Sequence, residues 1–158
     1  MLRLCILLWI ATVIAQAQNA PVQPIPFSHK THAEQHLKCT DCHSLPDPGE
    51  VMTFPSATKC MYCHRTIKTE SPAIKTLQAY AERKRPVPWV RVYEIPSYVY
   101  FSHKTHIDAD TDCAVCHGPV KERDRLSAEV SLHMQDCMNC HRAHKAPVDC
   151  GTCHELKN

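Results

Sequence analysis

Ten of the eleven cysteines form five pairs in which two residues separate the thiols and a histidine follows directly. C-x-x-C-H is the attachment signature of c-type haem: the two thiols bond to the porphyrin edge, and the histidine nitrogen ligates the iron. The sequence therefore predicts five covalently bound haem c groups. The attachment residues are Cys39, Cys42, Cys60, Cys63, Cys113, Cys116, Cys137, Cys140, Cys150 and Cys153, and the proximal iron ligands are His43, His64, His117, His141 and His154.

Three other uses of paired cysteines are weighed against haem. Two C-x-x-C units can bind zinc, but a four-thiolate zinc site does not require a histidine after each pair. A disulfide framework leaves the same five histidines unexplained. A thioredoxin-type redox pair occurs once per domain near a βαβ pattern, which this chain lacks. Five haems are the interpretation that uses every residue of the five motifs.

Seven further histidines are available as distal ligands, namely His29, His32, His36, His103, His106, His133 and His144. Four of them belong to an internal repeat, because the segment 27–32, Phe-Ser-His-Lys-Thr-His, recurs unchanged as residues 101–106. Each copy ends seven residues before a haem motif. A repeat of this kind indicates two related modules, and two histidines so close together can serve two neighbouring haems.

These motifs resemble those of the class III multihaem cytochromes c, small low-potential proteins whose haems carry two histidine ligands. Residues 101–154 are similar to the three-haem members, which have F-x-H-x-x-H, a haem motif, H-x-x-x-C-x-x-C-H and a last haem motif. The resemblance implies that His103 completes the His117 haem, that His106 completes the His141 haem, and that His133 completes the His154 haem.

The segment 27–64 resembles a shortened copy of the same pattern. The resemblance implies the pairs His29 with His43 and His32 with His64. A third haem motif is missing there, and Ser56 stands where the other copy has His133. The remaining His36 and His144 are interpreted as surface residues, with His36 as an alternative to His32. Met134 is a weaker alternative to His133, because Met can also ligate haem iron.

The first twenty residues have the pattern of a secretory signal peptide. Arg3 precedes an apolar stretch from Leu4 to Ala15, and Ala15-Gln16-Ala17 is a typical cleavage site. The stretch is shorter than the roughly 20 residues that span a bilayer, and retention as an uncleaved anchor is the alternative. We expect a periplasmic protein, with membrane association as the second possibility.

The predicted fold is mostly α with extensive irregular loops, a small haem-cored multihaem cytochrome c fold built from two related modules. The expected segments are a signal peptide (1–20), a two-haem module (21–69), a helix and aromatic connector (70–100) and a three-haem module (101–158). A helix is predicted for residues 72–84, with Ser71 as N-cap and Pro72 in the first turn. Residues 44–59 are expected to form a loop, and residues 87–101 have a β-prone, aromatic run.

The predicted function is electron transfer between redox proteins through closely spaced haems with two histidine ligands, so no catalytic residue is expected. Histidine on both faces leaves no position at the iron for a small-molecule substrate. The formal charge is only +2, and the sequence contains no basic stripe of the kind that binds nucleic acid. Haem propionates would bring the net charge to about −4, which favours docking on basic partner surfaces.

Three alternative functions remain. Residues 89–101, 116–118 and 132–142 resemble the multihaem subunits of membrane quinol-oxidising and quinone-reducing complexes, which implies an electron-transfer subunit of such a complex. A multihaem reductase acting on nitrite or sulfite would need one iron with an open position. Polymerisation into a haem filament is the last alternative.

Overall fold

The computed structural model describes residues 20–155, so most of the predicted signal peptide lies outside the described part of the chain. All regular structure in this range is helical. The helices are α2 (His29–Ala33), α3 (Cys39–Cys42), α4 (Ala57–His64), α5 (Pro72–Glu82), α6 (His103–Asp108), α7 (Cys113–His117), the 3-10 helix η1 (Val120–Glu122), α8 (Met134–Ala143) and α9 (Cys150–Cys153). Short helices joined by irregular segments confirm the predicted fold class.

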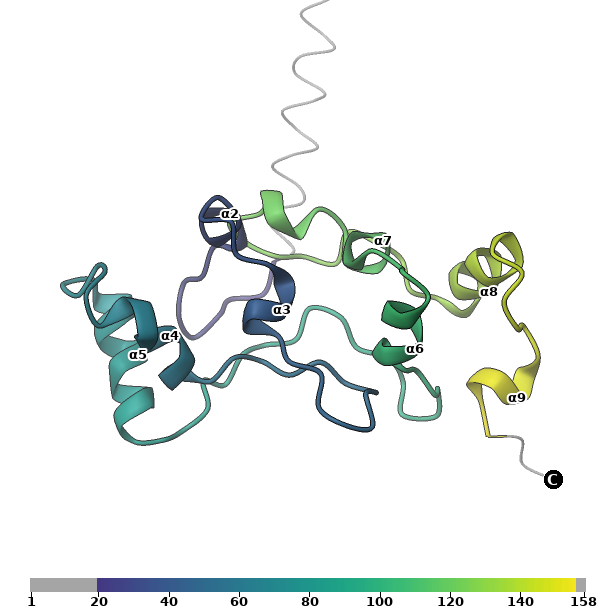
Figure 1. Cartoon of the computed structure of the whole chain (residues 1–158), viewed down its shortest axis with the longest axis horizontal. Coiled ribbons are helices and arrows are strands. Elements are labelled where there is room, and N and C mark those ends of the chain that lie inside the picture. Colours follow the sequence, from purple (N-terminus) through teal and green to yellow (C-terminus); the bar gives the residue numbers. More distant parts are fainter. Residues whose placement is uncertain (1–19, 156–158) are drawn as a thin grey trace, which may run out of the picture.

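The helices are spread along the long axis of the molecule (Figure 1). The α4–α5 pair occupies one end, and α8 and α9 occupy the other. Helices α2, α3, α6 and α7 lie between these ends. All five haem motifs are therefore distributed along the length of the molecule instead of being gathered around one centre.

The repeated segments fold in the same way. Ser28 is the N-cap of α2 and accepts a hydrogen bond from the Thr31 amide at 3.0 Å. Ser102 is the N-cap of α6 and accepts from the Thr105 amide at 3.3 Å. A serine side chain at this position satisfies one of the free amides at a helix start. The F-S-H-K-T-H sequence is thus a local folding signal as well as the segment that contains the predicted distal ligands.

Helices α4 and α8 also begin at equivalent positions. Ser56 is the N-cap of α4 and His133 is the N-cap of α8, both with extended backbone and both four residues before a haem-motif cysteine. The predicted loop over 44–59 is therefore too long, because helix α4 already starts at Ala57. The Ser56 hydroxyl accepts from the Lys59 amide, a capping signal that the loop prediction did not take into account.

Helix α5 confirms the prediction for residues 72–84, with an end at Glu82. Pro72 lies in the first turn and Ser71 occupies the N-cap position, although its side chain makes no capping hydrogen bond. Lys84 has φ +50°, in the left-handed region. A residue in this conformation ends a helix. The basic run at 83–85 therefore follows the helix instead of forming its last turn.

The small apolar core lies at the α4–α5 end. It consists of Ile25, Ala57, Ile74, Leu77 and Val87, with Met61 and Trp89 packed against it. Ile74 and Leu77 are one helical turn apart on α5 and face α4. Helix α5, between the two predicted modules, therefore packs on α4 of the predicted two-haem module.

The aromatic connector forms no strand within residues 20–155, and its one isolated β-bridge joins Val99 to His154. No described helix is both long and apolar enough to cross a membrane.

Candidate functional site

Each of the five C-x-x-C-H motifs lies on a helix or at its end, namely on α3, α4, α7, α8 and α9. In a helix, residues three and four positions apart share one face. The two thiols of a motif and the following imidazole therefore converge on one side of each helix. The ten cysteines are free thiols, either exposed or half-buried. This arrangement of two thiols and one imidazole fits the attachment and proximal ligation of haem c.

Four of the five predicted histidine pairs lie ring against ring. The distance between ring centres is 6.5 Å for His29 and His43, 6.1 Å for His32 and His64, 6.3 Å for His103 and His117, and 6.0 Å for His106 and His141. A metal–nitrogen bond of about 2 Å on each side, plus about 1 Å from nitrogen to ring centre, gives about 6 Å across one iron. We refer to each pair as a centre.

The two modules repeat each other at these centres. The imidazole planes are nearly parallel in the His29/His43 centre, at 6°, and in the His103/His117 centre, at 5°. They are inclined in the His32/His64 centre, at 62°, and in the His106/His141 centre, at 46°. The first and second histidines of each H-x-x-H segment thus face different motifs.

Seven of the ten predicted ligands have Nδ1 hydrogen-bonded to a backbone carbonyl. A carbonyl can only accept, so each Nδ1 carries the proton and Nε2 keeps its lone pair for a metal. The distances range from 2.6 Å, between His141 and Pro147, to 3.2 Å, between His154 and Tyr98. The other five are His32 to Ser28, His43 to Thr53, His64 to Ile67, His103 to Glu50 and His106 to Ser102.

Burial favours the neutral form of two histidines in these centres. Burial lowers the pKa of His29 to about 4, and the neighbouring His43 and His32 contribute to this shift. Burial also lowers the pKa of His117, with further contributions from His103 and His43. Only a neutral imidazole can bind a metal, so the environment of both residues favours the ligating form.

The fifth predicted pair, His133 with His154, has no such ring contact among the described residues. His133 is exposed at the N-terminus of α8, next to Met134, which is 64% exposed. The nearest aromatic ring to His154 is that of Tyr98, 6.0 Å away. His36 and His144 are exposed after the ends of α2 and α8.

Neighbouring thiols place the five motifs in a spatial order. Burial raises the pKa of the Cys60 thiol, with Cys42 raising it further, which puts the α4 motif beside the α3 motif. Burial also raises the pKa of Cys113, and Cys39 adds to this, so that the α3 motif adjoins the α7 motif.

The same relation continues through the second module. Burial raises the pKa of Cys116, with Cys140 and Cys137 adding to it, and burial raises the pKa of Cys137, with Cys153 adding to it. The motifs therefore follow one another in space as α4, α3, α7, α8 and α9, which agrees with the positions of these helices in Figure 1.

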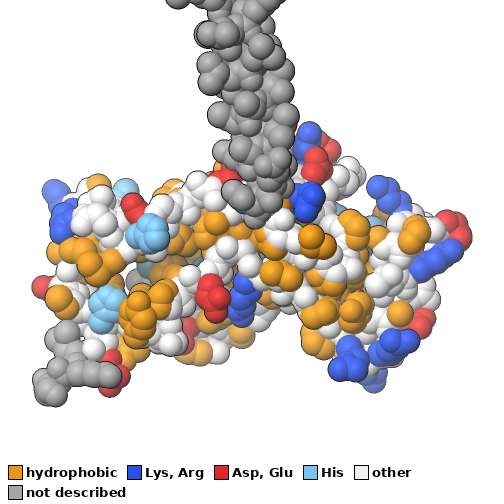
Figure 2. Space-filling view, turned by 180° about the vertical axis from the view of Figure 1, so that it is seen from behind, with side chains coloured by type: hydrophobic (Ala, Val, Ile, Leu, Met, Phe, Trp, Pro, Cys, Tyr) orange, Lys and Arg blue, Asp and Glu red, His pale blue; other side chains and the backbone are white. Residues whose placement is uncertain are grey.

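Large apolar side chains remain exposed at the motifs. Val115 on α7 is 53% exposed and Tyr62 on α4 is 66% exposed. Apolar surface covers much of the face seen in Figure 2. A porphyrin is a large apolar ring, and surfaces of this kind are suited to pack against one.

Aromatic residues that the sequence analysis did not assign to the site contact its histidines. The Phe27 ring stacks on His32 at 4.4 Å and meets His29 edge-on at 4.8 Å, and Phe101 repeats this with His106 at 4.6 Å and His103 at 4.8 Å. Their place in the repeat was the available signal. The Tyr93 ring, from the aromatic run at 87–101, meets His117 edge-on at 5.4 Å.

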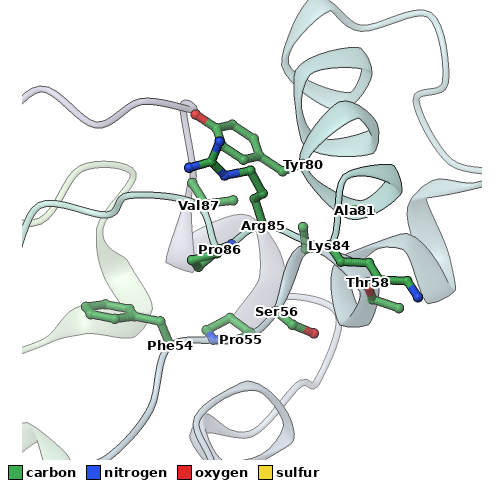
Figure 3. Close-up of a pocket in the computed structure, with 11 residues that line it drawn as sticks. Phe54, Pro55, Ser56, Thr58, Tyr80, Ala81, Lys84, Arg85, Pro86 and Val87 are labelled. Atoms are coloured by element: carbon green, nitrogen blue, oxygen red, sulfur yellow. The ribbon is translucent and has the colours of Figure 1, made fainter.

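A separate pocket of about 350 Å³ lies between the start of α4 and the end of α5. Figure 3 shows Phe54, Pro55, Tyr80, Pro86 and Val87 around it. The cationic side chains of Lys84 and Arg85 also line it. None of the predicted haem ligands lines this pocket.

Comparison with known proteins agrees with the cysteine and histidine pattern described above. Residues 10–87 match the class III cytochrome c family, and residues 99–155 match the family of cytochrome c7 and related cytochromes c. The chain is also similar to the menaquinone reductase multihaem cytochrome c subunit of Nitratidesulfovibrio vulgaris. The two are 28% identical over 141 residues, covering 75% of this chain and 67% of the relative.

Proposed function

Because the chain belongs to the multihaem cytochromes c, we propose that it is a five-haem member that transfers electrons between redox partners in the periplasm. Bound haem c would supply one-electron chemistry at iron. The ten motif cysteines attach the haems, and His43, His64, His117, His141 and His154 are the proximal ligands. The distal ligands are His29, His32, His103, His106 and His133.

The observation that carries the proposal is the facing of four histidine pairs at 6.0–6.5 Å. Each facing pair would supply both remaining ligands of a haem iron and would leave no position there for a substrate, which favours electron transfer over catalysis. The carbonyl bonds at Nδ1 fix the orientation of the rings, and Phe27 and Phe101 pack against the distal imidazoles. Ligands held in place before and after electron transfer need little reorganisation.

Mass spectrometry of the exported protein, together with its low-temperature EPR spectrum, tests this function. The expected result is the polypeptide mass without the signal peptide plus five haems, with only low-spin ferric signals. The bare polypeptide mass, or bound zinc, would refute haem binding. A resting high-spin signal that binds cyanide would instead favour a multihaem reductase.

A second candidate is an electron-transfer subunit of a quinone-linked membrane complex. The similarity to the menaquinone reductase subunit favours it. Solubilisation of membranes in a mild detergent, followed by purification through a tag on this chain, distinguishes the two. Co-purification of integral membrane proteins in fixed proportion supports the complex, whereas recovery of the chain alone in the periplasmic fraction supports a free carrier.

A further inference from the structure

The loop around Gly49, in the first module, binds the distal-histidine helix of the second. The Gly49 carbonyl accepts from the Lys104 amide at 2.9 Å. The Glu50 carbonyl accepts from the His103 amide at 3.3 Å and from His103 Nδ1 at 2.8 Å. The first turn of α6 and the ring of its first histidine are thus both held by this loop.

The second module in turn binds the distal-histidine helix of the first. The Arg123 carbonyl accepts from the Lys30 amide at 3.0 Å, and Asp124 Oδ1 accepts from the Ser28 hydroxyl at 2.6 Å. Ser28 is the N-cap of α2, and Lys30 follows His29 directly. These contacts fix the start of α2, where His29 faces His43.

The residues that hold α2 are themselves attached to the second module's first centre. The Arg123 guanidinium donates to both carboxylate oxygens of Glu129, at 2.7 and 2.9 Å. The Tyr93 hydroxyl oxygen accepts from the amides of Glu129 and Val130, at 2.9 and 3.0 Å. The Tyr93 ring contacts His117. A continuous set of contacts therefore runs from the His103/His117 centre to α2.

We propose that each module positions the distal histidine of the other module's first centre, with the loop at 49–50 acting on His103 and residues 123–124 acting on His29. The proposal rests on the proposed function of these histidines as iron ligands. It makes the two modules interdependent: a change in one module alters ligation in the other. Gly49 and Asp124 are positioning residues, since neither belongs to a centre.

Gly49 is suited to a direct test because its position admits no side chain. It is buried, has φ +93°, and an added Cβ would lie 2.6 Å from Lys104 Cβ. An alanine there is strained by the backbone and pushes the loop away from α6. Glu50→Ala is the matched control, because it removes an exposed side chain and keeps both carbonyls.

The full-length, haem-loaded protein is studied by low-temperature EPR. His103→Ala and His29→Ala first identify the low-spin signal of each centre by its loss. Gly49→Ala is then expected either to shift the signal assigned through His103 or to abolish it, and in the second case about one fifth of the iron becomes high-spin. The other four signals should stay, and Glu50→Ala should match the wild type. Five unchanged signals, or an even loss of all five, would overturn the proposal.

Asp124 provides an independent test if Gly49→Ala yields no mature protein. Asp124→Ala should disturb only the signal assigned through His29, in the other module. Asp124→Asn keeps an acceptor oxygen for Ser28 and should restore the signal. An unaffected His29 signal in Asp124→Ala contradicts the proposal. A wild-type protein that contains no haem would refute the proposed function itself. Failure of the proposed function and failure of this inference are therefore distinguishable.

Discussion

At the scale of single residues, the centres depend on hydrogen bonds that orient each imidazole. A histidine offers two nitrogens, and the backbone carbonyl at Nδ1 decides which one is available. His32 and His106 bond to the carbonyls of Ser28 and Ser102, at the same place in each repeat. The ring orientation of these ligands is therefore fixed by local sequence. The orientation of His103 depends on a residue 53 positions away, Glu50.

Tyr93→Phe should lower the stability of the haem-loaded protein. The change leaves the half-buried amides of Glu129 and Val130 without their acceptor and keeps the ring contact with His117. An unsatisfied buried group costs about 1–3 kcal/mol. Chemical denaturation followed by circular dichroism measures the effect. Tyr98→Phe, at a side chain that is 69% exposed, is the control and should change stability by less than about 0.5 kcal/mol.

The Arg123–Glu129 pair predicts a dependence on pH. The hydrogen bond from Arg123 lowers the pKa of Glu129, whose side chain is only 12% exposed. The folded protein therefore releases the proton more readily than the unfolded chain. The stabilisation is present above the unfolded pKa of about 4.3 and is lost as pH falls through the folded value.

Thermal unfolding of the wild type and of Glu129→Gln between pH 3 and pH 7 measures this contribution. The wild type should have the higher Tm at pH 7, and the difference should shrink as the solution is acidified below about pH 4.3. A Tm difference that stays constant over this range would contradict the assignment.

At the scale of the elements, the α4–α5 pair carries most of the apolar core. Leu77 on α5 is 6% exposed and packs in the cluster with Ala57 of α4. Leu77→Ala should cost about 2–5 kcal/mol, the range for removing a buried leucine side chain. Gln78→Ala, on the exposed face of the same helix, should be nearly neutral. Denaturant unfolding of both variants compares them; equal stabilities would show that α5 is not part of the core.

Much of the site could be predicted from the sequence, because its signals are local. The haem motifs, the repeat and helix α5 are all defined by residues within a few positions of one another. The end of α5 was harder to predict from the sequence, since it depends on the left-handed conformation of Lys84. The contacts of Gly49, Asp124 and the Arg123 carbonyl with α6 and α2 could not be predicted, because they join segments far apart in the chain, and those of Gly49 and Arg123 use backbone atoms that any residue supplies.

At the scale of the whole molecule, charge is unevenly distributed. Residues 57–91 carry eight Lys and Arg but only two Glu, whereas the other described residues carry eight Lys and Arg and fourteen Asp and Glu. The basic side chains gather at the α4–α5 end (Figure 2). The net charge that suggested docking on basic surfaces thus conceals a positive end, beside the outermost motif of the row.

This separation of charge predicts where an anionic oxidant reacts. At low salt, ferricyanide should be attracted to the α4–α5 end. Lys84→Glu combined with Arg85→Glu should slow oxidation of the reduced protein several-fold, and the effect should disappear at high salt because the charges are then screened. Stopped-flow absorbance at a haem band measures the rate.

The matched control places the same change of charge at the other end, as Arg142→Glu with Lys145→Glu on and after α8. It should slow ferricyanide less than the α5 variant does, because these residues stand among more acidic ones. A cationic oxidant such as hexaamminecobalt(III) should instead be attracted to the acidic part of the molecule. The added glutamates should therefore not slow its reaction. If both variants slow ferricyanide equally, net charge and not its distribution controls the reaction, and the positive end does not steer the approach of partners.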